Sequence, residues 1–169
     1  MPATLDPALP DDVLDGAQGV LELAHRRDFK LATAESCTGG LLAALLTDVP
    51  GRSHVFERGF VVYSNDAKCD LLGIARDEVE RCGAVSAEVA RAMSQGALHN
   101  SRADIALSIT GFAGPAGPHD EEGLVHFACT RREDSTSERE EHFGPIGRQG
   151  VRVAALKVAL ELLEGALGS

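Results

Sequence analysis

The sequence predicts an α/β protein, namely a three-layer α/β/α domain with a mixed, mostly parallel five-stranded sheet. Two observations predict this class. Short apolar stretches typical of strands alternate with segments of helical periodicity, which is the pattern of βαβ units. Three loops rich in small or polar residues each directly follow a predicted strand, and parallel strands end at one edge of their sheet. With 169 residues, the chain is long enough to bury one core.

The first third of the chain predicts a leader, two helices and two strands. Residues 1–10 contain three prolines, so we expect a loose leader there and a single domain over residues 11–169. Apolar residues at helical spacing then predict a helix that Asp11 or Asp12 caps and that ends near Arg27. The next expected elements are a strand, a helix and a second strand, at residues 29–34, 41–49 and 55–63.

The rest of the chain predicts further helices and a hairpin. Residues 64–66 (Ser-Asn-Asp) form a strong helix-start cluster, and Ser86 is expected to cap a helix that runs through about His99. The helix at 148–164 has the clearest apolar face, and Gly165 is a natural stop for it. Also expected are a short helix ending near residues 72–73, a turn or two at 76–80, a central strand at 105–109, and strands at 124–130 and 139–143.

Composition limits the kinds of partner and compartment. The chain has 26 acidic and 16 basic residues, and the resulting net charge of −10 disfavours nucleic acid or an acidic membrane as a partner. The four cysteines are scattered without C-x-x-C or zinc-type spacing, which fits reduced thiols, and histidines and carboxylates show no ligand-like grouping. No signal peptide or membrane-length apolar run is visible. We therefore expect a cytoplasmic protein without a metal or other cofactor.

The chain is organised around residues 34–40, Ala-Glu-Ser-Cys-Thr-Gly-Gly, between a predicted strand and a predicted helix. A strand that turns into a helix through small residues leaves backbone N–H groups unpaired at the turn. Ser36 and Cys37 are therefore candidate nucleophiles beside an anion site. The alternative is that Ser36 or Thr38 only caps the helix and that the glycines only form a tight turn, and the local pattern slightly favours this alternative.

A serine nucleophile needs a base, and Lys68 is a better candidate for this base than any of the histidines. None of the six histidines lies in a motif-like context, and no G-x-S-x-G motif is present. Lys68 follows the second strand within one helical turn, but it can act as a base only if burial or a second cation lowers its pKa. The sequence alone favours the alternative that Lys68 is a solvated surface lysine. Tyr63 can be a core or rim aromatic residue, and Arg148 either an anion clamp or a surface arginine.

Four motifs in one order resemble the C-terminal domain family of competence/damage-inducible protein A (CinA). These are A-E-S-C-T-G-G at 34–40, F-V-V-Y-S-N-D-A-K at 60–68, G-A-V-S at 83–86 and T-G-F-A-G-P at 110–115. The resemblance runs from about residue 14 to residue 167. It implies a three-layer α/β/α fold and the activity of the family's stand-alone members, which are nicotinamide-nucleotide amidases.

The resemblance also implies roles for individual residues. The expected reaction converts the carboxamide of nicotinamide mononucleotide to nicotinate mononucleotide and ammonia, without a metal or cofactor. Ser36 matches the family's nucleophile, with Lys68 and Tyr63 as the other catalytic residues, and a homo-oligomer is expected. The residues expected to bind substrate are Glu35, Cys37, Thr38, Gly39, Gly40, Thr110, Gly111 and Arg148.

Two hypotheses from different classes remain open at this point. In the first, the protein is an amidase in which Ser36 attacks and Lys68 moves the proton. In the second, it is a binding module that keeps the pocket and recognises a nucleotide without turning it over. The second is kept because residues 116–122 are shorter and more acidic than the corresponding family loop and lack its lysine.

Overall fold

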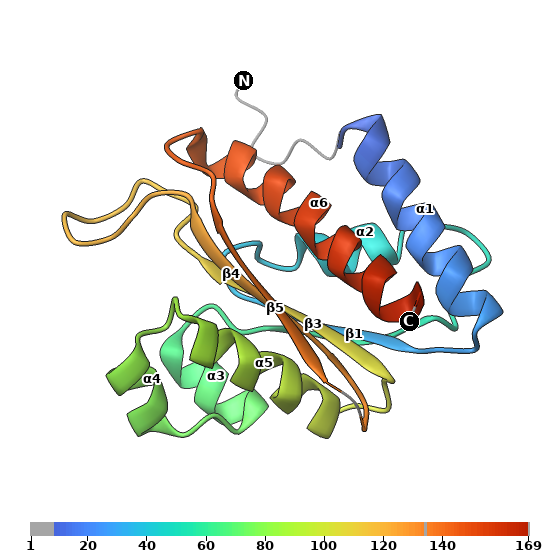
Figure 1. Ribbon diagram of the computed structural model, residues 1–169, viewed down its shortest axis with the longest axis horizontal. Coiled ribbons are helices and arrows are strands. Elements are labelled where there is room, and N and C mark those ends of the chain that lie inside the picture. The colour runs from blue at the N-terminus through green and yellow to red at the C-terminus, as the bar shows by residue number, and fades with distance from the viewer. Residues whose placement is uncertain (1–8, 134, 169) are drawn as a thin grey trace.

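A computed structural model describes residues 9–133 and 135–168, which form a five-stranded sheet between two layers of helices (Figure 1). The expected leader therefore lies almost wholly outside the described residues. Of its last two residues, Leu9 packs against the core and Pro10 precedes the first helix. The elements are α1 (Asp11–Arg26), β1 (Leu31–Glu35), α2 (Leu41–Leu46), β2 (Phe56–Val61), α3 (Asn65–Leu72), α4 (Arg76–Cys82), α5 (Ala87–His99), β3 (Ile105–Gly111), β4 (Leu124–Arg131), β5 (Thr136–His142) and α6 (Gly147–Gly168).

The sheet is mixed, with strand order β2-β1-β3-β4-β5. β1 pairs in parallel with β2 and β3, whereas β4 runs antiparallel to both β3 and β5. Four strands therefore point the same way, which confirms the predicted fold class. Glu35 at the end of β1 lies opposite Val61 of β2 and Ile109 of β3. The loops that follow these three strands consequently meet at one edge of the sheet.

The core lies on both faces of the sheet. Helices α1, α2 and α6 cover one face, and α3, α4 and α5 cover the other (Figure 1). On β1, Leu31 faces the first layer while Ala32 and Ala34 face the second, as alternation along a strand requires. These alanines are small, which allows the buried face of α5 to approach the sheet closely.

Several element ends differ from the sequence-based expectation. Neither Asp11 nor Asp12 caps α1, because Pro10 occupies the cap position and both aspartates lie in the first turn, where their charge suits the helix dipole. Helix α6 continues past Gly165 to Gly168, because Leu167 is fully buried in the core and its burial favours the extra turn. Strand β5 begins three residues earlier than predicted, and α2 ends at Leu46.

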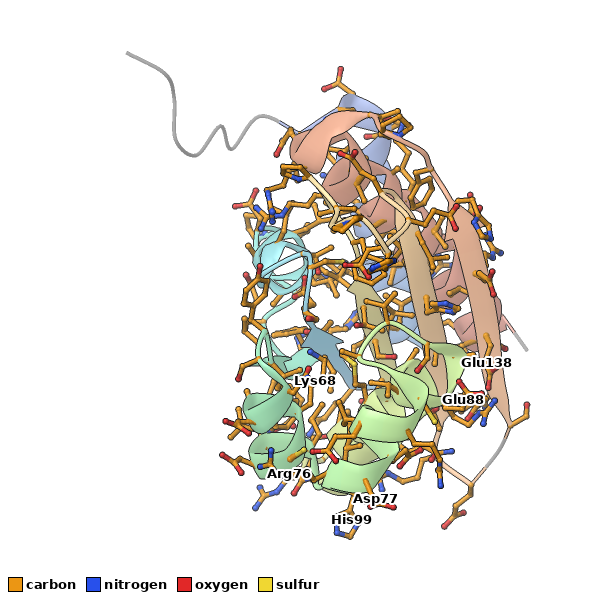
Figure 2. The ribbon with its side chains drawn as sticks, turned by 90° about the vertical axis from the view of Figure 1, so that its left-hand side faces the viewer. Lys68, Arg76, Asp77, Glu88, His99 and Glu138 are labelled. Atoms are coloured by element: carbon orange, nitrogen blue, oxygen red, sulfur yellow. The ribbon has the colours of Figure 1, made fainter. Side chains whose placement is uncertain are left out.

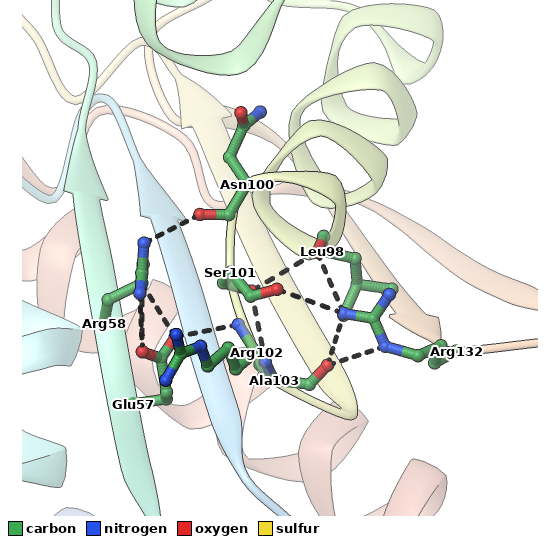
Figure 3. A network of polar contacts seen from close by, with 8 residues as sticks. All are labelled: Glu57, Arg58, Leu98, Asn100, Ser101, Arg102, Ala103 and Arg132. Carbon is green, nitrogen blue, oxygen red and sulfur yellow. Dashed lines mark hydrogen bonds and ion pairs between the residues drawn. The ribbon is translucent and has the colours of Figure 1, made fainter.

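A polar network ties the sheet to the C-terminal end of α5, at the edge away from the loops described above (Figure 3). Arg132 donates to the carbonyl oxygens of Leu98, in the last turn of α5, at 2.9 Å and of Ala103, in the segment that follows the helix, at 2.7 Å. Arg58 of β2 donates to the Asn100 carbonyl at 3.0 Å and pairs with Glu57 at 2.8 Å. This network fixes how α5 leads into the central strand β3.

No helix among the described residues combines the length and the apolar character that crossing a membrane requires.

Candidate active site

Ser36 lies on a tight turn between β1 and α2. Its N–H donates to the carbonyl of Ile109 on β3 at 2.9 Å, and its own carbonyl accepts from Gly39 N at 3.1 Å. Gly39 and Gly40 have φ values of +61° and +97°, a backbone conformation that residues with a Cβ adopt only at a cost. The glycines of the motif therefore allow the turn that places Ser36 at the end of the strand.

Lys68 is brought to this turn by α3. The hydroxyl of Ser64 caps α3 by accepting from Ala67 N at 3.0 Å, as the helix-start cluster predicts, so Lys68 falls in the first turns of the helix. Its side chain is only 1% exposed, and Nζ lies 3.1 Å from Ser36 Oγ. Figure 2 shows Lys68 inside the molecule between α3 and the sheet, whereas Arg76 and Asp77 lie at the outer surface. The structure thus brings together the two residues that the sequence placed on different loops.

The environment of Lys68 disfavours the charged ammonium. Burial is the main cause that lowers the pKa of Lys68, while the nearby thiols of Cys37 and Cys69 oppose this shift. Besides Ser36, its hydrogen-bond partners are the carbonyls of Val62 at 3.0 Å and Tyr63 at 3.3 Å. In the parts of the chain that the structure describes, Lys68 forms no ion pair. Nζ donates to Ser36 Oγ and to the two carbonyls, and a neutral amine would keep the two carbonyl bonds while its lone pair accepts the Ser36 hydroxyl proton.

Cys37 is buried and suits a thiol rather than a thiolate. Its side chain is 4% exposed, and burial raises its pKa to about 11. The charge of Arg152 lowers this pKa and that of Glu35 raises it, but both are smaller effects than burial. Of the two candidate nucleophiles, the structure therefore favours Ser36.

A small cavity of about 150 Å³ lies next to the turn that carries Ser36, with Cys37 of that turn in its lining. The rest of the lining consists of Tyr63, residues 111–117, Asp120 and Arg148. Tyr63 is 67% exposed, so the single tyrosine is a rim residue rather than a core residue. Larger hollows lie at residues 46–56 and between α3 and α5, but no residue of the Ser36 turn lines them, whereas Cys37 of that turn lines the small cavity. The cavity next to the Ser36 turn is therefore the relevant one.

Two residues expected to bind substrate also hold the loops of the site. Thr110 is 1% exposed, and its hydroxyl donates to the carbonyl of Ala84 at 2.7 Å. This bond fixes the loop that leads into α5 against the end of β3. Arg148 at the start of α6 donates to the Gly114 carbonyl at 2.6 Å, which joins α6 to the loop after β3. Gly111 ends β3, where an added Cβ would lie 2.8 Å from the Leu124 carbonyl oxygen.

The free backbone donors lie in the turn rather than in the helix that follows. The N–H groups of Leu42 and Ala43 at the start of α2 donate to the Glu35 carboxylate, at 2.9 and 3.0 Å. Among the described residues of the turn, Cys37, Thr38 and Gly40 are those whose backbone N–H donates to no other residue. The sequence predicted unpaired backbone N–H groups at this turn, and the structure has them in the turn itself, before the first residue of α2.

Arg152 of α6 contributes to this turn, although the sequence did not single it out. Its Nε donates to the Cys37 carbonyl at 3.0 Å. An arginine in the middle of a helix carries no local signal of such a contact, because the contact spans 115 residues of sequence. In the described ranges, no group of three or more histidine, cysteine, aspartate or glutamate residues is arranged to hold a metal ion.

These features define a class before any comparison: a three-layer α/β/α domain that presents a serine beside a buried lysine at the ends of its parallel strands. A family model described as the CinA C-terminal domain matches residues 15–167. The chain therefore belongs to the CinA family.

Relatives and solved structures agree with this assignment. A CinA-like protein of Syntrophobacter fumaroxidans is 42% identical over 155 residues, which are 90% of this chain and 36% of that protein. A CinA-like protein of Akkermansia muciniphila is 49% identical over 113 residues, 66% of this chain and 27% of that protein. The chain thus spans about a third of the length of the curated relatives it matches.

Among solved structures, the competence/damage inducible protein CihA of Agrobacterium tumefaciens superimposes with a TM-score of 0.92 at 41% identity, over 96% of this chain and 99% of that one. The competence damage-inducible protein A (ComA) of Klebsiella pneumoniae gives a TM-score of 0.87 at 32% identity, over 92% and 97% of the two chains.

Proposed function

We propose that this CinA-family domain hydrolyses the carboxamide of nicotinamide mononucleotide to nicotinate mononucleotide and ammonia. The observation that carries the proposal is the 3.1 Å contact between Ser36 Oγ and the buried Nζ of Lys68. A serine is a weak nucleophile unless a base lies within hydrogen-bond reach, and a lysine serves as that base only when its pKa is lowered. Both conditions hold at this site. The choice of substrate comes from the resemblance of the four motifs.

The proposed reaction has two halves. Ser36 Oγ forms a bond to the carboxamide carbon while its proton passes to Nζ of Lys68. Lys68 then returns the proton to the amide nitrogen, the carbon–nitrogen bond breaks, and ammonia leaves. Water attacks the resulting ester while Lys68 accepts a proton from it; the bond between the carbon and Ser36 Oγ then breaks, Lys68 returns the proton to Oγ, and the carboxylic acid leaves. No step requires a metal ion or an oxidant.

The backbone N–H groups of the turn are the proposed hydrogen-bond donors to the negatively charged oxygen that forms in each half of the reaction. Within the described residues, the N–H groups of Cys37, Thr38 and Gly40 donate to no other residue, and they belong to the same turn as Ser36. A donor of this kind contributes about 10²–10³ in rate, because it binds the oxyanion of the transition state more strongly than the ground-state carbonyl. We assign the oxyanion to this group of donors.

The cavity fits one end of such a substrate. Its volume of about 150 Å³ is below the ~300–1,000 Å³ common for whole-ligand pockets, so it takes the ring and carboxamide while the sugar and phosphate remain outside. Arg148 lies on the cavity wall and is exposed, which suits contact with the phosphate. Tyr63 at the rim offers an aromatic face to the ring and its main-chain carbonyl to Lys68.

The direct test is ammonia release from nicotinamide mononucleotide by the purified protein and by two variants. Ser36→Ala is expected to abolish release while the fold is retained. Lys68→Arg is expected to be nearly inactive, because a guanidinium keeps the charge but does not give up a proton near neutral pH. The wild-type rate is expected to rise with pH through an apparent pKa below that of a free lysine. An active Ser36→Ala variant would contradict the proposal.

A second candidate function is a binding module that recognises the nucleotide without hydrolysis. The observation that favours it is Asp120, which lines the cavity and belongs to an acidic loop that lacks the lysine of the family loop. The same experiment separates the two functions. Tight binding measured by calorimetry, with no ammonia released by the wild type, would support the binding module and contradict the amidase.

A further inference from the structure

Glu35 is completely enclosed beside the Ser36 turn, and all its contacts are with its own chain. Its exposed fraction is 0%. One carboxylate oxygen, Oε1, accepts from Thr38 Oγ1 at 2.6 Å and from Leu42 N at 2.9 Å, and the other, Oε2, accepts from Ala43 N at 3.0 Å. The three hydrogen bonds offset the free-energy cost of burying the carboxylate, and this compensation is lost if the turn changes its geometry.

These contacts replace the cap that α2 lacks. The cap position is held by Gly40, which has no side chain to offer, and α2 is only six residues long. Its first free N–H groups are satisfied from the strand that precedes the turn instead. Glu35 therefore spans the turn at its base and ties the end of β1 to the start of α2.

The turn is also held from its other side. Arg152 donates to the Cys37 carbonyl, and Ser36 N is bound to Ile109 on β3. With both ends of the turn fixed, the unengaged N–H groups between them keep one orientation. A donor stabilises an oxyanion at little cost only when it is already oriented before the reaction.

We propose that Glu35 is a positioning residue whose carboxylate holds the turn so that its free N–H groups face the oxyanion formed at Ser36. This inference rests on the proposed hydrolysis at Ser36 and assigns Glu35 a holding role in place of the substrate contact that the family motif suggested. Its effect acts on the transition state, since the negative oxygen exists only there. Loss of the carboxylate is therefore expected to lower kcat while KM stays nearly constant.

The test compares Glu35→Gln with Thr33→Val, a matched control two residues earlier on the same face of β1. Thr33 is also 0% exposed, and its hydroxyl has no hydrogen-bond partner among the residues that the structure describes, so valine is expected to leave activity unchanged. In Glu35→Gln, an amide N–H₂ faces the N–H of Ala43, so one acceptor becomes a second donor. We expect kcat for ammonia release to fall by about ten-fold or more, with KM within about two-fold of the wild type.

A milder variant covers the case in which Glu35→Gln does not fold, as judged by circular dichroism. Thr38→Val removes one of the three donors to Glu35 and keeps the carboxylate. It is expected to lower kcat less than Glu35→Gln, again without a change in KM. A raised KM with unchanged kcat in either variant would place Glu35 in substrate binding and overturn the proposal, as would wild-type values of both constants.

A second readout does not depend on the substrate. A sulfonyl fluoride reacts with an activated serine: the Ser36 oxygen bonds to sulfur, the S–F bond breaks, fluoride leaves, and Lys68 takes the hydroxyl proton. The labelling rate, followed by mass spectrometry, is expected to fall in Glu35→Gln and to be unchanged in Thr33→Val. If the wild type is labelled but releases no ammonia, the proposed substrate is wrong. Equal labelling rates in the wild type and Glu35→Gln would overturn the role of Glu35.

Discussion

At the scale of single residues, the site depends on an amine that the fold keeps away from water. Lys68 is 1% exposed and has no carboxylate among its hydrogen-bond partners. Natural proteins seldom bury a lysine in this way, because its charged form is disfavoured without solvent or an opposite charge. The protein keeps this destabilising group next to Ser36, where the proposed reaction requires a base.

Lys68→Met is therefore expected to abolish ammonia release and to raise the free energy of unfolding at pH 7. Burial lowers the pKa of Lys68 from 10.5, so between the lowered value and 10.5 the unfolded chain binds a proton that the folded chain does not. This penalty is absent above pH 10.5 and grows as the pH falls. Urea unfolding at pH 7 and pH 10 is expected to show the largest gap between variant and wild type at pH 7. A wild type that is more stable than the variant at pH 7 would contradict this account.

Cys37 supplies an independent test of which atom is the nucleophile. Because burial raises its pKa to about 11, the thiol is expected to react slowly with iodoacetamide until the pH approaches that value. Cys37→Ala is expected to retain most of the wild-type kcat, since only the backbone N–H of this residue serves the reaction. Loss of activity in Cys37→Ala together with an active Ser36→Ala would give the chemistry to the thiol.

The sequence could indicate the Ser36 and Lys68 loops because both follow parallel strands, and such strand ends meet by the geometry of the sheet alone. The contact between the two side chains is confirmed by the structure, while their catalytic roles remain predictions. Arg152 could not be found in this way, since its contact with the Cys37 carbonyl depends on how α6 packs across the sheet. The burial of Glu35 could not be predicted either, because it depends on how the first turn of α2 folds back so that the N–H groups of Leu42 and Ala43 bind its carboxylate.

At the scale of elements, the sequence predicted the presence and type of most helices and strands, and the errors lie at their ends. Helix α6 shows the reason. A glycine after an apolar face is a common stop signal, but here the next turn buries Leu167, and that gain outweighs the poor helix propensity of Gly165. Local signals mark a helix end only where no tertiary contact favours the next turn.

Gly165→Ala is consequently expected to stabilise the protein by about 0.5–1 kcal/mol, because glycine is a poor residue inside a helix. Among the described residues, apart from the chain neighbours and the nearby backbone of α6 itself, no atom lies within 4 Å of the place that a Cβ would take here. Gly73→Ala is the matched control: it also has open space, but its φ of +70° at the end of α3 disfavours alanine. Thermal unfolding is expected to shift upwards for the first variant and downwards for the second. A destabilised Gly165→Ala would mean that the helix ends before this residue.

At the scale of the whole molecule, one sheet supports two separate apolar layers, which Figure 1 shows above and below it. Strands β1 and β3 contribute side chains to both layers, so neither layer keeps its packing surface if the other unfolds. The two layers are therefore expected to unfold together, as single domains of this size usually do.

Truncating one buried residue in each layer tests this expectation. Leu163→Ala on α6 and Met93→Ala on α5 each remove a fully buried side chain, and each is expected to cost about 2–5 kcal/mol. Both variants are expected to keep the wild-type m-value in urea and to show coincident transitions by circular dichroism and tyrosine fluorescence. Two separate transitions in either variant would show that the layers are independent units.

The arrangement of the site along the chain has a consequence for how proteins with this fold diverge. Ser36, Lys68 and the elements that join them come from one short continuous stretch, β1 to α3, while most of the cavity lining comes from the loop after β3 and the start of α6, with Cys37 and Tyr63 as the contribution of the first stretch. Substitutions, insertions and deletions in residues 112–122 can therefore accumulate without touching the stretch that holds the reacting groups. Under the proposed function, the range of substrates can change during evolution while the reaction stays the same. The acidic loop of this chain, residues 116–122, is where such a change is expected.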